Sequence, residues 1–107
     1  PHQEIVDLYH ECLPALPRVA VWNEKRQGYL RVSWNQVADD IKKETGEFTK
    51  EDGLNWWRKY FIFVSKSKFL TGQVTSKNGR QFVADLEFLV KSGNLIKVSE
   101  YKYHRED

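Results

Sequence analysis

The chain contains a single cysteine, no methionine and no long apolar run, and each shortage excludes a class of protein. Cys12 alone cannot form an intrachain disulfide, on which small secreted domains often depend, so we expect a reducing cytoplasm as the compartment. A membrane-spanning helix needs about 20 consecutive apolar residues, and no run approaches that length. The N-terminus also lacks the basic region and apolar stretch of a signal peptide. The sequence therefore predicts a protein that is neither membrane-spanning nor exported.

Residue groups that carry catalysis or bind metals are scarce as well. The three histidines are scattered, and no Cys or carboxylate accompanies them at a metal-ligand interval beyond what chance supplies. The six glycines are dispersed, so a Gly-rich phosphate-binding loop is absent. Cys12 falls on an apolar helical stripe, where a free cysteine usually behaves as a small buried hydrophobe. We therefore expect no enzymatic activity, no metal and no cofactor.

The composition that is present fits one domain. The 107 residues are 40% hydrophobic and 14% aromatic, which is enough for one core, whereas two domains would each bury little surface. We therefore expect a single domain over residues 1–107. The start at Pro1 together with the lack of methionine favours a piece cut from a longer protein.

Apolar residues recur at helical spacing in most of the chain. Pro14 and Pro17 end the first helical segment and predict an extended connector as far as Val21. The first two expected helices cover about His2–Leu13 and about Glu24–Glu44. The third runs from Thr49 to the closing sequence Phe69-Leu70-Thr71-Gly72. A fourth is marked by Phe82, Leu86, Leu89 and Val90 and stops at Gly93, and a short fifth runs from Asn94 to about Glu100. The alternation from Leu95 to Tyr103 fits a strand equally well.

Capping residues support these helix ends. Asn23 is suited to the N-cap of the second helix and Gly46 to its C-terminal stop, while Thr49-x-x-Asp52 forms a weak capping box before the third. Inside the second helix, Gly28 and the segment from Ser33 to Asn35 are poor helix formers. They are the points where that helix could break or kink.

A turn signal separates the third and fourth helices. Residues Val74 to Val83 surround Asn78-Gly79, a pair that favours a tight hairpin turn, so we expect a loop or a short ribbon there, with Gly72–Gln81 as the most mobile interior segment. The predicted fold is all-α, a compact bundle of four to five helices with one long loop or short hairpin before the fourth helix. Its expected core consists of Leu8, Leu30, Trp34, Trp57, Phe61, Leu86 and Leu89.

The distribution of charge is more informative than the net charge of +2. Between Gly53 and Ala84 there is no Asp or Glu, while basic and aromatic residues alternate. Basic side chains neutralise phosphates, and exposed aromatic rings stack on unpaired bases at about 1 to 3 kcal/mol per base. The pattern predicts a nucleic-acid-binding surface, single strands favoured, formed by Trp56, Arg58, Lys59, Tyr60, Lys66, Lys68, Lys77 and Arg80.

The same stretch also fits a structure without a binding surface, in which the aromatic residues form the core and the basic residues lie on a solvated helix face. Trp57, Phe61 and Val64 lie on one helical stripe and are expected in the core. Trp56, Tyr60 and Phe63 lie off that stripe and are the better candidates for a surface. A basic run of this size is also common on a solvated helix face, so both interpretations stay open at this point.

Several blocks of the sequence, in their order and spacing, resemble the C-terminal domain of phage and prophage replication-initiation proteins. The resemblance covers nearly the whole chain. It is carried by Tyr9-His10, Leu13-Pro14-x-Leu16-Pro17-Arg18, Trp22-x-x-x-Arg26, Trp57-x-x-Tyr60-Phe61, Phe69-Leu70-Thr71-Gly72, Ala84-Asp85-Leu86-Glu87-Phe88-Leu89, Asn94-x-x-Lys97-Val98 and Tyr101-x-Tyr103. Two features depart from the family pattern: a longer insertion from Asn35 to Lys50, and Glu100 where a Gly is expected.

The resemblance implies a function without catalysis. In that family an N-terminal domain recognises the replication origin, and the C-terminal part is associated with recruiting the replicative helicase or its loader and with contacting melted DNA. The chain would then be the C-terminal part of a longer replication protein, with DNA and a helicase or helicase loader as partners.

Three hypotheses follow from the residues and the resemblance together. The first is a replication accessory module that binds DNA and recruits a helicase or its loader. The second is a pure protein-interaction domain whose basic segment is merely solvated. The third is a helix-turn-helix reader of double-stranded DNA, with Asn55, Arg58 and Lys59 on the recognition helix.

Overall fold

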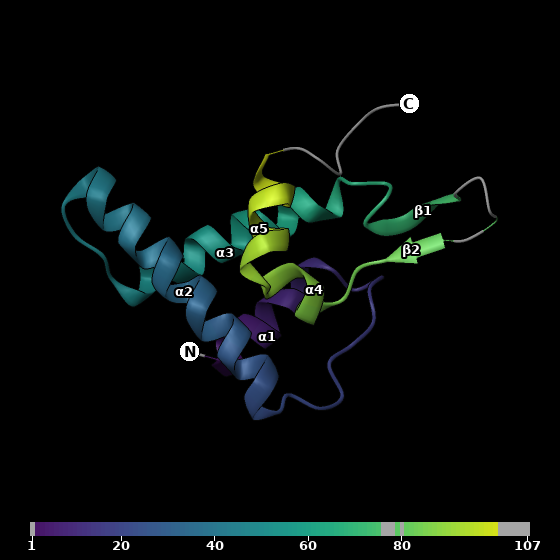
Figure 1. Ribbon diagram of the computed structural model, residues 1–107, viewed down its shortest axis with the longest axis horizontal. Helices are drawn as coiled ribbons and strands as arrows, with labels where there is room; N and C mark the ends of the chain where they lie inside the picture. The colour runs from purple at the N-terminus through teal and green to yellow at the C-terminus, as the bar shows by residue number, and fades with distance from the viewer. Residues whose placement is uncertain (1, 76–78, 80, 101–107) are drawn as a thin grey trace.

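Five helices and a two-stranded antiparallel hairpin make up the part of the chain described in the computed structural model, which covers residues 2–75, 79 and 81–100 (Figure 1). The elements are α1 (His2–Cys12), α2 (Glu24–Thr45), α3 (Lys50–Ser65), β1 (Thr71–Thr75), β2 (Gln81–Val83), α4 (Leu86–Val90) and α5 (Ser92–Ser99). A compact, mostly helical domain with a short hairpin before the fourth helix was predicted from the sequence, and it is confirmed.

The predicted caps of α2 and α3 are present. The Asn23 side chain accepts a hydrogen bond from the backbone N–H of Arg26 at 3.0 Å, and Gly46 ends α2 in the left-handed region with φ of 89°. Thr49 and Asp52 exchange side-chain and backbone hydrogen bonds at 3.2 and 3.0 Å, which completes the capping box. Local sequence therefore determines these three helix ends.

The long helix predicted over about Glu24–Glu44 is present as α2. The helix runs without interruption past Gly28 and past the Ser33–Asn35 segment. Ser33 is fully buried and its hydroxyl donates to the carbonyl of Val90, so the residue with poor helix propensity is held by a tertiary hydrogen bond. Packing of Leu30 and Val37 on the same side outweighs the small propensity cost.

Some predicted boundaries are wrong. Helix α3 ends at Ser65, not at Gly72, because Ser67 is buried and its hydroxyl accepts the backbone N–H of Leu70, which turns the chain into β1. Helix α4 begins only at Leu86 and leaves Phe82 in β2. Helix α5 already includes Gly93 and Asn94, which were expected to separate the last two helices.

The core gathers around α3. Trp57, Phe61 and Val64 of α3 are fully buried, and α3 packs chiefly against α1 and α2. Of the predicted core, Leu30, Trp57, Phe61, Leu86 and Leu89 are buried, while Leu8 and Trp34 are only partly buried and pack against it. The prediction missed several buried side chains, among them Ile5, Tyr9, Leu13, Leu16, Tyr60, Leu70 and Val98.

Gly53, in the first turns of α3, is covered by the rings of Trp34 and Phe48. A Cβ added there would lie 2.5 Å from Trp34 Cη2 and 2.8 Å from Phe48 Cζ, two rings that pack edge to face with centroids 5.8 Å apart. The absence of a side chain at Gly53 therefore lets the two rings cover the start of α3.

Gly53→Ala is expected to lower the free energy of unfolding. Overpacking usually costs about 1 to 3 kcal/mol and alanine returns about 1 kcal/mol of helix propensity, so the net loss should reach up to about 2 kcal/mol. Gly28→Ala, where nothing lies within 4 Å of the added Cβ, should instead stabilise by about 0.5 to 1 kcal/mol. The free energy of unfolding of both variants is measured by urea denaturation. An equal increase in both would contradict the tight packing at Gly53.

Candidate nucleic-acid interface

An exposed basic stripe runs along α3. Asn55, Lys59, Ile62 and Lys66 are all exposed and follow one another at intervals of four, three and four residues, which places them on one side of the helix. Lys66 is the C-cap of α3, and Lys68 is exposed in the turn that follows. Lys59 and Lys66 are seven residues apart, a rise of about 10 Å. The stripe leads from the middle of α3 toward the hairpin, which projects from the helices (Figure 1).

The ammonium groups of this stripe are not neutralised by the protein. Among the described residues no carboxylate oxygen lies within 4 Å of the Nζ atom of Lys59, Lys66 or Lys68. The sequence from Gly53 to Ala84 supplies no carboxylate of its own. We refer to Lys59, Lys66 and Lys68 as the lysine edge. Its uncompensated charge is what a phosphate backbone requires.

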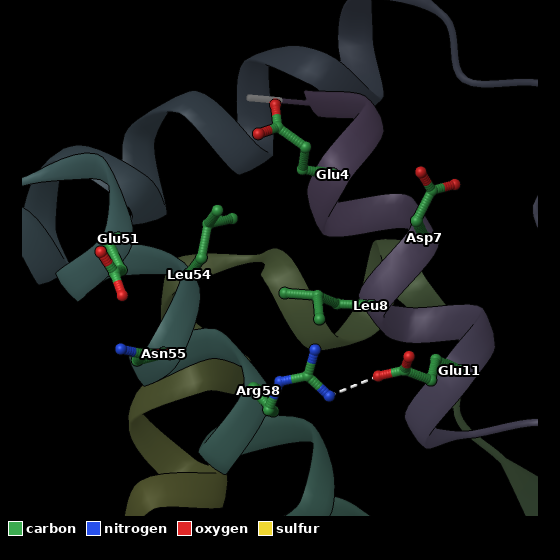
Figure 2. A pocket seen from close by; sticks show the side chains of 8 residues that line it. All are labelled: Glu4, Asp7, Leu8, Glu11, Glu51, Leu54, Asn55 and Arg58. Carbon is green, nitrogen blue, oxygen red and sulfur yellow. Dashed lines mark hydrogen bonds and ion pairs between the residues drawn. The ribbon is translucent and has the colours of Figure 1, made fainter.

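Arg58 lies apart from the lysine edge. Its guanidinium reaches toward α1 and forms an ion pair with Glu11 (Figure 2). The charge is therefore already compensated, on a side of α3 different from that of Lys59. The sequence prediction grouped Arg58 with the lysines because Glu11 is 47 positions away in the chain and gives no local signal.

Tyr60 was predicted for the surface, and this prediction is wrong. Its side chain is only 5% exposed, and its hydroxyl donates to the Leu89 carbonyl at 2.8 Å. Burial raises the pKa of the Tyr60 hydroxyl well above its usual range. The α4 segment covers this side of α3, so a position off the main apolar stripe is nevertheless in the core.

Trp56 is half-buried and keeps part of its ring accessible. One ring face stacks on Tyr60 with centroids 5.3 Å apart and planes at 16°, and Trp57 contacts Trp56 edge-on at 5.1 Å. The remaining surface lines an open depression of about 400 Å³ between α2 and α3. Lys59 lines the same depression, together with Ile41, Thr45, Glu47, Asp52 and Asn55. A base could lie against Trp56 there with its phosphate at Lys59, on the side away from Glu47 and Asp52, which give the lining of the depression a net charge of −1. Phe63, the third off-stripe aromatic, is partly buried and packs against the core.

The hairpin is fixed to the helical body at its base. Phe69 stacks on Phe82 with centroids 5.1 Å apart, and Phe82 contacts Phe88 edge-on at 5.0 Å. The pairing of Thr71 with Val83 and the hydrogen bond from Ala84 N–H to the Leu70 carbonyl at 2.9 Å continue this anchor. The ribbon expected from the sequence is thus present. Lys77 and Arg80 lie outside the described residues, as do residues 76 and 78 of the Gly72–Gln81 segment that was expected to be mobile.

The described residues include Cys12 and two of the three histidines. They contain no group of three or more His, Cys, Asp or Glu side chains that could hold a metal ion. Cys12 is half-buried, and burial raises the pKa of its thiol, which disfavours the reactive thiolate. His10 is engaged in structure, since its Nε2 accepts the backbone N–H of Val19 at 3.1 Å. Over the same residues, no helix has the length and apolar character needed to cross a membrane.

Comparison with known proteins adds no assignment. No family model matches the chain, and no curated protein and no solved structure is significantly similar to it. The resemblance to replication-initiation proteins therefore depends on the sequence blocks alone, and the interface described above depends on the geometry alone.

Proposed function

We propose that this domain is a non-enzymatic replication accessory module of a phage or prophage protein that binds DNA, single strands in preference to duplex, and recruits the replicative helicase or its loader. The DNA-binding part is supported by one observation above all: the three cations of the lysine edge have no carboxylate within 4 Å among the described residues, and one of them, Lys59, lines the same depression as Trp56. The replication part is supported by the ordered sequence blocks.

Single strands are favoured over duplex for a physical reason. An unpaired base can lie against Trp56 while its backbone follows Lys59 and Lys66, and a stacked base within a duplex cannot reach a half-buried ring. A helix-turn-helix mode has less support, because Arg58 is paired with Glu11 and only Asn55 and Lys59 remain of the three predicted base-reading residues.

The proposal is tested with labelled oligonucleotides of one sequence, single-stranded and double-stranded, whose fluorescence anisotropy is followed at low ionic strength. We expect weak binding that is tighter for the single strand. Tighter binding to one particular duplex would favour the helix-turn-helix alternative. If the domain bound neither form of DNA but still bound a replicative helicase or its loader, the alternative of a pure protein-interaction domain would be favoured.

Trp56→Leu is expected to reduce affinity for single strands more than affinity for duplex. Leucine keeps an apolar contact with Tyr60 but removes the ring that stacks on a base, a loss of about 1 to 3 kcal/mol or roughly 5- to 150-fold in affinity. Ile62→Leu, on the exposed stripe of the same helix, serves as the matched control. The same anisotropy measurement gives both affinities, and an equal loss for both DNA forms would remove Trp56 from the site.

A further inference from the structure

A groove between α1 and α3 differs in chemistry from the lysine edge. It is open, has a volume of about 380 Å³ and lies beside the ion pair of Arg58 with Glu11 (Figure 2). Leu8 of α1 points toward α3, and Leu54 of α3 also lines the groove. Both leucines are only partly buried, although the spacing of Leu8 predicted a core position. The structure therefore leaves an accessible apolar strip between two helices.

Carboxylates surround this apolar strip. Glu4, Asp7 and Glu11 come from α1 and Glu51 from α3, while Arg58 is the one cation in the lining of the groove. Four carboxylates against one guanidinium give the lining a net charge of −3. DNA phosphates would be repelled from such a surface, whereas cationic side chains would be attracted.

Two ion pairs cross from α1 to α3 at either end of the groove. Lys50 Nζ lies 2.5 Å from Glu4 Oε2 near the start of both helices, and Arg58 pairs with Glu11 further along. All four side chains are between 44% and 61% exposed, so these pairs contribute little to stability and can exchange with other cations. Among the described residues, Asp7 and Glu51 have no cation within 4 Å. These two carboxylates are thus not in an ion pair within the described residues, and Asp7 accepts one hydrogen bond, from Gln3 Nε2 at 2.9 Å.

We propose that this groove docks a basic amphipathic segment of a partner protein, with apolar side chains against Leu8 and Leu54 and Lys or Arg side chains beside Asp7 and Glu51. The apolar strip supplies buried area, and the charges select a basic partner and set its orientation. This site does not depend on the DNA-binding proposal, because it uses the opposite charge and different residues.

The probe for the test is a labelled, helix-forming peptide with two leucines four residues apart, flanked by lysine and arginine. A second peptide carries glutamate at every basic position. On the domain, Asp7→Lys with Glu51→Lys reverses the charge of the groove. Asp39→Lys with Asp40→Lys makes the same change in net charge on an exposed part of α2 and serves as the matched control. Melting temperatures verify that both variants fold.

We expect the basic peptide to bind the wild-type domain and the α2 control with similar affinity, and the reversed groove about tenfold more weakly. The glutamate peptide should show the converse preference and bind the reversed groove best. Single-strand affinity should not fall in the reversed groove, since added positive charge does not weaken attraction to phosphate.

Three results would overturn the proposal. One is that the basic peptide binds the reversed groove and the α2 control equally weakly, which would mean that only the net charge of the domain matters. Another is equal peptide binding by wild type and the reversed groove. A third is a self-associated domain that dissociates on groove reversal and ignores the peptide, which would make a second copy of this chain the occupant. If the wild-type domain bound the basic peptide but no oligonucleotide, the DNA-binding proposal would be contradicted and the groove proposal would be supported.

Discussion

Replacing Trp57 by alanine is expected to lower the free energy of unfolding by about 3 to 5 kcal/mol, the usual range for removing a large aromatic from a core. The Trp57 side chain is 0% exposed, and its ring contacts those of Trp56, Tyr60 and Phe61 at centroid distances of 5.1, 5.4 and 5.8 Å. The total free energy of unfolding of a small domain is about 5 to 15 kcal/mol, so the variant should be marginally folded or unfolded at physiological temperature.

Ile62→Ala provides the control for this substitution. Ile62 lies on the same helix, is 43% exposed and should change stability by less than about 1 kcal/mol. Thermal and urea denaturation of both variants makes the comparison. A Trp57→Ala protein that melts within a degree or two of wild type would contradict the assigned core.

Reversing two charges of the lysine edge, with Lys66→Glu and Lys68→Glu, is expected to weaken single-strand binding by roughly tenfold or more at low salt. The substitutions remove two phosphate contacts and add repulsion. The melting temperature should change little, because both lysines are exposed and neither has a carboxylate within 4 Å among the described residues.

Lys25→Glu with Arg31→Glu on α2 is the matched control for the lysine edge. Both residues are exposed, and the change in net charge is the same. A general electrostatic effect would weaken DNA binding equally in the two double variants. Equal weakening would therefore contradict a localised interface on α3.

The parts of the fold that could be predicted from the sequence are those determined locally. The caps at Asn23 and Gly46 and the box at Thr49 and Asp52 each depend on residues a few positions apart, and all three are present. The helix α2 was also predicted, but the buried hydrogen bond from its Ser33 to a carbonyl 57 positions away could not be. The end of α3 likewise depends on the buried hydroxyl of Ser67.

The candidate interface was predictable only in part, for the same reason. The spacing of Lys59 and Lys66 along one helix side is visible in the sequence, and both are exposed. Tyr60 was misplaced because α4, which covers it, is distant in sequence. The ion pair of Arg58 with Glu11 was not predicted, because Glu11 lies 47 positions away on α1. The groove between α1 and α3 was not foreseen at all, since it arises from the pairing of two helices.

The salt dependence of single-strand binding tests the central claim most directly. For wild type, the logarithm of the association constant should fall linearly with the logarithm of salt concentration, by about 0.7 for each phosphate neutralised. Loss of two contacts in the Lys66→Glu, Lys68→Glu variant should make the slope shallower by about 1.4, while the α2 control keeps the wild-type slope. Identical slopes in all three proteins, or no binding of single strands by wild type even at low salt, would contradict a DNA interface on the lysine edge.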